Sequence, residues 1–267
     1  MEQYETAIFS LKEYIDWVEK NYKRKAYYRG HADINWHLIP SVFRNPYKGL
    51  ISEHIFLKQA SSHAWCELLK YHSYLEKLIF LQHYGLPTRL LDVTFNPLVA
   101  LYMACCSNDD KDGVVYVGYR YEQDNYNIAE KTIEYVFSHN YIMAKDDLDK
   151  FARSHKLPLE DFCKPLFIFP PLNNSRIERQ QGAFIMAPYA KNNDGIPFDT
   201  NDSFDSTNFF ENNKAVIPNS KKEKLLRHLS ILGMNEASFY QSISNKLSCV
   251  IQEEIWRIKD EDAIELE

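Results

Sequence analysis

The chain has 267 residues and a formal net charge of −6, with 45% hydrophobic and 25% charged residues. These values are ordinary for a globular protein, and the acidic balance excludes a general attraction to nucleic acid, although a local basic groove stays open. No segment approaches the roughly 18 apolar residues of a membrane helix, and no signal-peptide core follows the acidic start Met1–Glu5, so we expect a cytoplasmic protein with no membrane partner.

The predicted helices and strands follow one another in an irregular order. They begin with a helix over 10–23, a strand over 25–29 that breaks at Gly30, helices over 52–72 and 74–84, a strand over 88–93, a helix over 98–106 and a strand over 113–119. After a mixed, charged stretch over 122–163 come strands over 166–169 and 183–187, a long loop near 191–213, and helices over 220–232 and 236–258.

The clearest local signals lie at helix ends. Ser10 and Glu13 form the Ser-x-x-Glu pattern of a capping box, and Gly85 is typical of a helix C-terminus. Asn96 followed by Pro97 supplies an N-cap and a first helical residue, and the helix that follows is apolar on nearly every face, so we expect it to be buried.

This order is not the regular strand–helix alternation of a parallel doubly wound sheet. It predicts an α+β fold, with a central mixed or antiparallel sheet flanked by helices. We see no internal repeat and no convincing linker, so the prediction is a single domain over residues 1–267. The oligomeric state stays open.

Five cysteines carry no C-x-x-C spacing; they are Cys66, Cys105, Cys106, Cys163 and Cys249. The sequence therefore predicts neither a disulfide framework nor a structural zinc site, and no metal ligands are assigned. Cys105 and Cys106 fall in the apolar helix, where we expect both to be small buried hydrophobic residues.

Two apolar segments contain polar residues that a core alone would not hold. Residues 81–101 read as core apart from His83, Thr88, Arg89, Asp92, Thr94 and Asn96, and Arg29 lies in the aromatic strand before them. An unpaired charge in a core costs several kcal/mol, so such groups either satisfy one another or serve a site.

Each candidate has a functional and a structural interpretation. Arg29 can clamp a phosphate or carboxylate, with Gly30 leaving room for a ligand, or it can pair with Asp92 or Glu178. Asp92 is either one half of a buried ion pair or a catalytic carboxylate. His83 is either an acid–base or hydrogen-bonding group or a structural histidine.

Three motifs resemble those of one protein family, the FRG domain. They are Tyr28-Arg29-Gly30 followed by Trp36 to Arg44, then Gln82 to Asp92 with Asn96 to Leu101, and finally Arg176 to Phe184. The family is named for its Phe/Tyr-Arg-Gly motif and occurs in bacterial and phage-linked proteins. The resemblance covers about residues 20–255 and implies a nucleotide-handling protein in a defence or toxin setting.

The order of these motifs is also similar to that of ADP-ribosyltransferases, although the late motif lacks their plain Glu-x-Glu. This second resemblance implies an ADP-ribosyltransferase-like fold and NAD as the substrate, with a protein or nucleic acid as acceptor. It assigns catalytic roles to Arg29, His83, Thr88, Asp92, Glu178 and Gln181, and ligand binding to Tyr28, Arg29, Gly30, Arg89 and Phe184.

In that interpretation Arg29 holds a phosphate, His83 and Thr88 orient the ribose or nicotinamide, and Glu178 or Gln181 polarises the ribose hydroxyl or the acceptor. We then expect Arg29, His83 and Gln181 to surround one concave surface. The alternative is a sensor or interaction module that binds a nucleotide, nucleic acid or phage protein without turnover.

Overall fold

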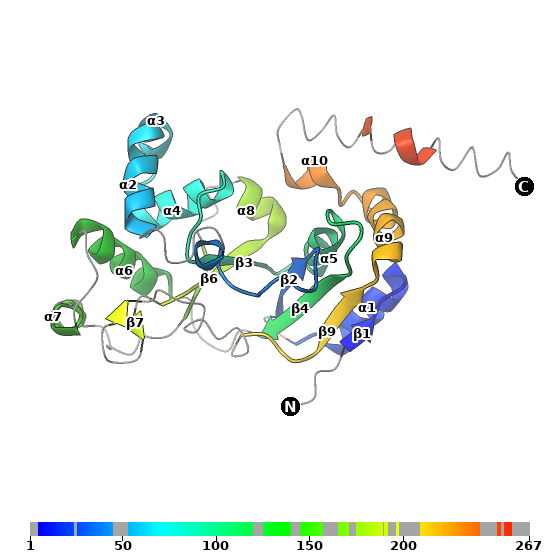
Figure 1. Ribbon diagram of the computed structural model, residues 1–267, viewed down its shortest axis with the longest axis horizontal. Coiled ribbons are helices and arrows are strands. Elements are labelled where there is room, and N and C mark those ends of the chain that lie inside the picture. Colours follow the sequence, from blue (N-terminus) through cyan, green and yellow to red (C-terminus); the bar gives the residue numbers. More distant parts are fainter. Residues whose placement is uncertain are drawn as a thin grey trace, which may run out of the picture.

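A seven-stranded mixed sheet forms the centre of the computed structural model (Figure 1). The structure describes residues 5–23, 26–44, 53–119, 125–139, 145–156, 165–170, 175–188, 190–191, 196–197, 209–240, 250–251 and 254–257. In spatial order the strands are β1 (Glu5–Ala7), β9 (Lys214–Ile217), β4 (Gly113–Tyr119), β2 (Ala26–His31), β3 (Leu90–Thr94), β6 (Gly182–Met186) and β5 (Leu166–Ile168). Only the β1–β9 pair in this sheet is parallel. The predicted α+β, single-domain arrangement is confirmed.

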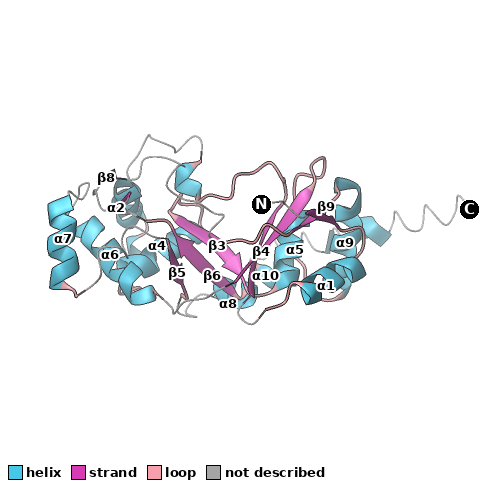
Figure 2. Ribbon diagram, turned by 90° about the horizontal axis from the view of Figure 1, so that it is seen from below, coloured by secondary structure: helices cyan, strands magenta, loops and turns pink. Residues whose placement is uncertain are grey.

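Helices cover the sheet in two groups, which Figures 1 and 2 show at opposite ends of the molecule. The first group contains α1 (Leu11–Lys20), α5 (Pro97–Cys105), α9 (Asn219–Ile231) and α10 (Glu236–Phe239). The second contains α2 (Glu53–His63), α3 (Trp65–Leu68), α4 (Tyr74–His83), α6 (Tyr126–His139), α7 (Lys145–Ser154) and α8 (Ser175–Gln180), of which α8 reaches back toward α10. Each group buries its own apolar cluster against its own half of the sheet.

The two halves of the sheet meet at a single residue pair. Strand β2 pairs with β4 along all six of its residues, but it pairs with β3 only where Tyr28 lies opposite Thr94. Beyond that pair β3 follows β6 instead, from Leu90 to Thr94. Because the strands separate there, residues from both faces of the sheet can reach the space between them.

Gly30 lies inside β2 and does not end the strand, so the predicted break is wrong. A Cβ atom built on Gly30 would lie 1.9 Å from the main-chain oxygen of Ala100 in α5. The glycine is therefore required because α5 packs directly on the backbone of β2. This contact places the helix beside the separating strands.

Helix α5 forms as its sequence predicts. The side chain of Asn96 accepts a hydrogen bond from the amide of Leu98 at 2.9 Å, and Pro97 is the first helical residue. Most of the helix is buried, including Cys105, as expected. Cys106 is exposed instead, because it is the C-cap residue beyond the last buried turn.

Several expected elements differ in the structure. The predicted helix over 52–72 divides at Ala64 into α2 and α3, and a capping box formed by Ser73 and Glu76 begins α4. At α1 the predicted capping box is half formed: Ser10 accepts from the amide of Glu13, but the Glu13 carboxylate accepts from the amide of Phe9. The strands β1 and β9 and the helix α8 were not predicted, being three, four and six residues long. Such short segments show little periodicity.

The C-terminal third shows two further differences. The predicted loop near 191–213 contains one strand of a small hairpin, Ile196–Pro197 paired with Ala190–Lys191, and most of the remainder lies outside the described residues. Of the predicted helix over 236–258, α10 forms Glu236–Phe239, and residues 250–251 and 254–257 are also helical, while residues 241–249 and 252–253 lie outside the described part. Among the described residues, no helix is both long and apolar enough to cross a membrane.

Candidate functional site

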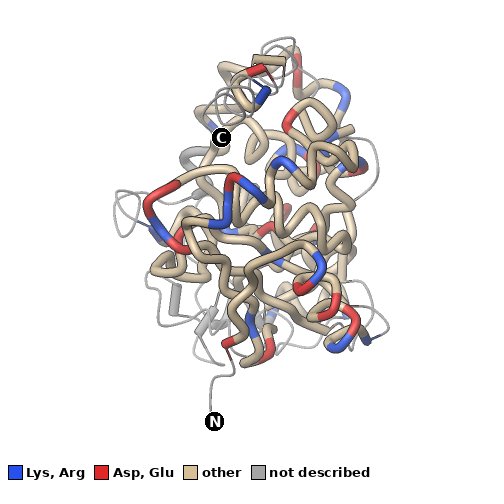
Figure 3. The backbone as a smooth tube through the Cα atoms, turned by 90° about the vertical axis from the view of Figure 1, so that its right-hand side faces the viewer, with Lys and Arg blue, Asp and Glu red and all other residues tan. Residues whose placement is uncertain are grey.

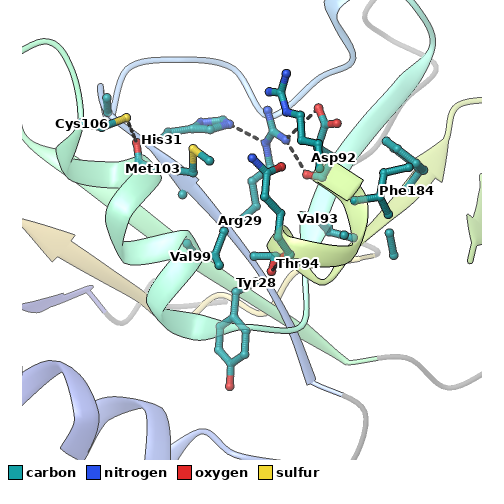
Figure 4. A pocket seen from close by; sticks show the side chains of 18 of the residues that line it. Tyr28, Arg29, His31, Asp92, Val93, Thr94, Val99, Met103, Cys106 and Phe184 are labelled. Carbon is teal, nitrogen blue, oxygen red and sulfur yellow. Dashed lines mark hydrogen bonds and ion pairs between the residues drawn. The ribbon is translucent and has the colours of Figure 1, made fainter. Parts of the chain in front are cut away.

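A cleft of about 280 Å³ lies where β2 and β3 separate (Figure 4). Helix α5 forms one wall through residues such as Val99 and Met103, and α8 with the end of α4 forms the other. Strand alternation places Asp92 and Phe184 on the helix-covered face of the sheet and Arg29 and His31 on the opposite face. The cleft therefore collects side chains from both faces.

Arg29 bridges the gap between the two strands. Its Nη1 donates a hydrogen bond to the main-chain oxygen of Asp92, and its Nε donates to Nε2 of His31 at 2.8 Å. The Asp92 carboxylate lies 3.8 Å from Nη1, and the Arg29 side chain is only 14% exposed. Burial lowers the pKa of Arg29 to about 10, so the guanidinium still carries its charge at neutral pH.

His31 is a neutral hydrogen-bond acceptor in this arrangement. It is buried, and burial together with the charges of Arg29 and Arg44 lowers its pKa to about 2. Because Nε2 accepts from Arg29, the ring proton resides on Nδ1. His31 thus orients Arg29 and contributes no charge to the cleft.

Arg44 supplies a second guanidinium to the same end of the cleft. Its Nε and Nη2 atoms both donate to the main-chain oxygen of Ile39, at 3.0 and 2.7 Å. Burial lowers the pKa of Arg44, and the carboxylate of Asp92 opposes that shift. The side chain is therefore held by the backbone while it lines the cleft.

Asp92 provides a carboxylate that a chain of polar side chains orients. Its Oδ1 accepts from the amide of Gln82 at 2.7 Å, and Gln82 in turn accepts from the hydroxyl of Thr88. One half of a buried ion pair would be enclosed, but the Asp92 side chain is 58% exposed because it faces the open cleft. Its carboxylate nevertheless lies beside an arginine, Arg29, as expected.

The opposite end of the cleft is formed by α8 and the residues around it. Arg176 donates to the main-chain oxygen of His83 at 3.1 Å, and its guanidinium lies 4.7 Å from the ring centroid of Tyr240. Burial and then Arg176 lower the pKa of His83 to about 4, so this imidazole is also neutral. Gln180 and Phe184 complete the wall.

The lining of the cleft is positively charged in a chain of negative net charge. Arg29, Arg44 and Arg176 line it, and Asp92 is the single carboxylate among its described lining residues. Figure 3 shows acidic and basic residues interspersed along the described backbone. A concave, partly desolvated arginine cluster of this kind favours anionic ligands.

The structure brings five of the predicted residues to the cleft and holds four away. Arg29, Gly30, His83, Asp92 and Phe184 line it. Tyr28 contributes only its backbone, because its ring points away into the core of the α1–α5 half (Figure 4).

The four residues outside the cleft have structural surroundings. Thr88 is fully buried beneath Gln82, and Arg89 is buried and donates to the main-chain oxygen of Pro188 at 2.7 Å. Glu178 is exposed on α8. Gln181 is exposed with a φ of 46°, in the turn that joins α8 to β6, and its neighbour Gln180 lines the cleft in its place.

Sequence reasoning did not select His31, Arg44, Arg176, Gln82 or Gln180. Arg44 ends the second part of the first motif and Arg176 begins the third, so both were visible as charges at motif ends. The hydrogen bond from Arg29 to His31 follows from their i, i+2 spacing in a strand, which places both side chains on one face. The role of Gln82 depends on where α4 packs, which no local pattern indicates.

The described residues contain no cluster of three or more His, Cys, Asp or Glu side chains placed to share a metal ion.

Residues 24–113 match the family model of the FRG domain. The FRG match begins just before β2 and ends at the first residue of β4, so it contains Arg29, Arg44, His83 and Asp92. No curated protein matches the chain, and no solved structure does.

Proposed function

We propose that the cleft binds a phosphate-bearing nucleotide and that the chain is an NAD-consuming enzyme similar in chemistry to ADP-ribosyltransferases. The observation that carries the proposal is the convergence of Arg29, Arg44 and Arg176 on one concave surface with a single carboxylate among its described lining residues. Guanidinium groups bind phosphate through paired hydrogen bonds and charge. The FRG match covers the part of the chain that supplies two of these arginines.

The reaction would break the bond between the nicotinamide nitrogen and the ribose carbon C1′. The bonding electron pair leaves with nicotinamide, and a water or acceptor hydroxyl forms the new bond to C1′ and loses its proton. Positive charge develops on the ribose in the transition state, and a carboxylate stabilises such charge. Asp92 is the lining residue with this property, and Gln82 orients it.

Release of nicotinamide is the direct test. Purified protein is incubated with NAD, and nicotinamide and ADP-ribose are separated and quantified by chromatography. We expect turnover that falls by roughly 100-fold or more in Asp92→Asn, which keeps the side-chain shape and removes the charge. Glu178→Gln is the matched control and should retain activity, because Glu178 lies outside the cleft.

A second candidate function is nucleotide binding without turnover, as in a sensor or interaction module. The observation that favours it is the position of Glu178, which is the acidic residue of the late motif, is exposed on α8 and is not among the residues that line the cleft. Thermal stabilisation by NAD or ADP-ribose with no nicotinamide release would select this function over the enzyme.

A further inference from the structure

We propose that Arg29 and Arg44 together form a diphosphate subsite, so that the cleft selects ligands with two linked phosphates over monophosphates and nucleosides. This inference rests on the proposed nucleotide-binding function and specifies which part of the ligand the cleft recognises. Arg44 would then be a specificity-determining residue that the sequence motifs did not single out.

Both guanidinium groups retain donors for a ligand. Arg29 uses Nε for His31 and Nη1 for Asp92. Arg44 uses Nε and Nη2 for one carbonyl, that of Ile39. Nη2 of Arg29 and Nη1 of Arg44 thus make no hydrogen bond within the described part of the chain, and both residues line the cleft.

The protein itself does not neutralise this pair of charges. The two guanidinium groups are close enough for Arg44 to lower the pKa of Arg29, after the larger effect of burial. Asp92 is the one described carboxylate that acts on both, and it is largely exposed. His31 stays neutral beside them. The site is partly buried and carries two positive charges and one negative charge. An anionic ligand would compensate the excess positive charge and so bind more favourably than a neutral one.

Both arginine side chains are also preorganised. His31 and the Asp92 carbonyl hold Arg29, and the Ile39 carbonyl holds Arg44, so neither side chain must be ordered when the ligand binds. Fixed donors lose less conformational entropy on binding than mobile ones. Arg29 and Arg44 each offer one set of fixed N–H donors to the cleft. Two linked phosphates could therefore bind side by side, each accepting hydrogen bonds from one guanidinium group.

The experiment compares adenosine, AMP and ADP by isothermal titration calorimetry with the wild-type chain and with Arg44→Gln. We expect ADP to bind roughly tenfold or more tightly than AMP, and Arg44→Gln to reduce the ADP affinity to about that of AMP while adenosine binding is unchanged. Arg153→Gln, at an exposed position of α7, is the matched control and should behave as wild type.

Arg44 also contacts the backbone at Ile39, so Arg44→Lys is a second variant that keeps the charge and loses the planar fork. The Arg44→Lys variant should lose part of the preference for ADP over AMP. A thermal melting curve of each Arg44 variant establishes that it is folded. Equal affinity for AMP and ADP in wild type, or unchanged ADP binding in a folded Arg44 variant, would overturn the subsite while leaving a nucleotide cleft. If none of the three compounds binds, the proposed function fails and the subsite fails with it.

Discussion

Replacing Gly30 with alanine tests whether this glycine serves packing or ligand access. The added Cβ would lie 1.9 Å from the main-chain oxygen of Ala100 and 2.9 Å from the amide nitrogen of Ala104. Both contacts are to backbone, so no side chain can rotate away and α5 would have to move by about 1 Å. Overpacking of this kind typically costs about 1–3 kcal/mol, and rigid backbone contacts place Gly30→Ala at or above the upper end.

A loss of about 3 kcal/mol in a chain of this size lowers the melting temperature by roughly 6–12 °C. Thermal and urea unfolding followed by circular dichroism measure this change. The matched control is Gly182→Ala, another lining glycine, where the new Cβ would meet Ile177 Cγ2 at an ordinary 3.6 Å and should cost little. If Gly30→Ala has the same melting temperature as wild type but no longer binds nucleotide, the packing explanation is refuted. The glycine would then be required to leave room for the ligand.

Three further predictions concern residues around the cleft and the core. Arg89→Met removes buried hydrogen bonds to main-chain oxygens and should destabilise the chain by about 3 kcal/mol in urea unfolding, with nucleotide affinity unchanged; weakened binding in folded protein would return Arg89 to the site. Lys222→Met should cost about 3 kcal/mol, because its Nζ donates to three main-chain oxygens that lose this donor on substitution; an unchanged urea midpoint would contradict this. The pKa values of His31 and His83 lie below the ordinary 6.5, so the unfolded chain takes up protons first, and the free energy of unfolding should fall as the pH drops from about 6.5 toward 4. Replacing His83 by Asn should flatten that dependence, and an identical slope would show that its imidazole titrates normally.

The sequence predicted the parts of the fold that local chemistry decides. The cap at Asn96 with Pro97 and the apolar run after it specify α5, and the run from Gly113 to Tyr119 specifies β4. Arg29 and Asp92 are unusual polar residues in apolar segments, and they indicate the position of the cleft from the sequence alone. These features depend on neighbours within a few residues, and so the local sequence is enough to predict them.

Only the tertiary structure decided how these parts meet. Strand alternation says that Tyr28 and Arg29 face opposite ways, but not which of them faces the cleft, and the packing of α5 on Gly30 settles that choice. The six-residue helix α8 turns Gln180 into the cleft and leaves Gln181 in the turn outside it. Arg44 becomes a neighbour of Arg29 because the segment after β2 folds back over the sheet. Such choices depend on contacts between residues distant in sequence, whose free energies no local pattern contains.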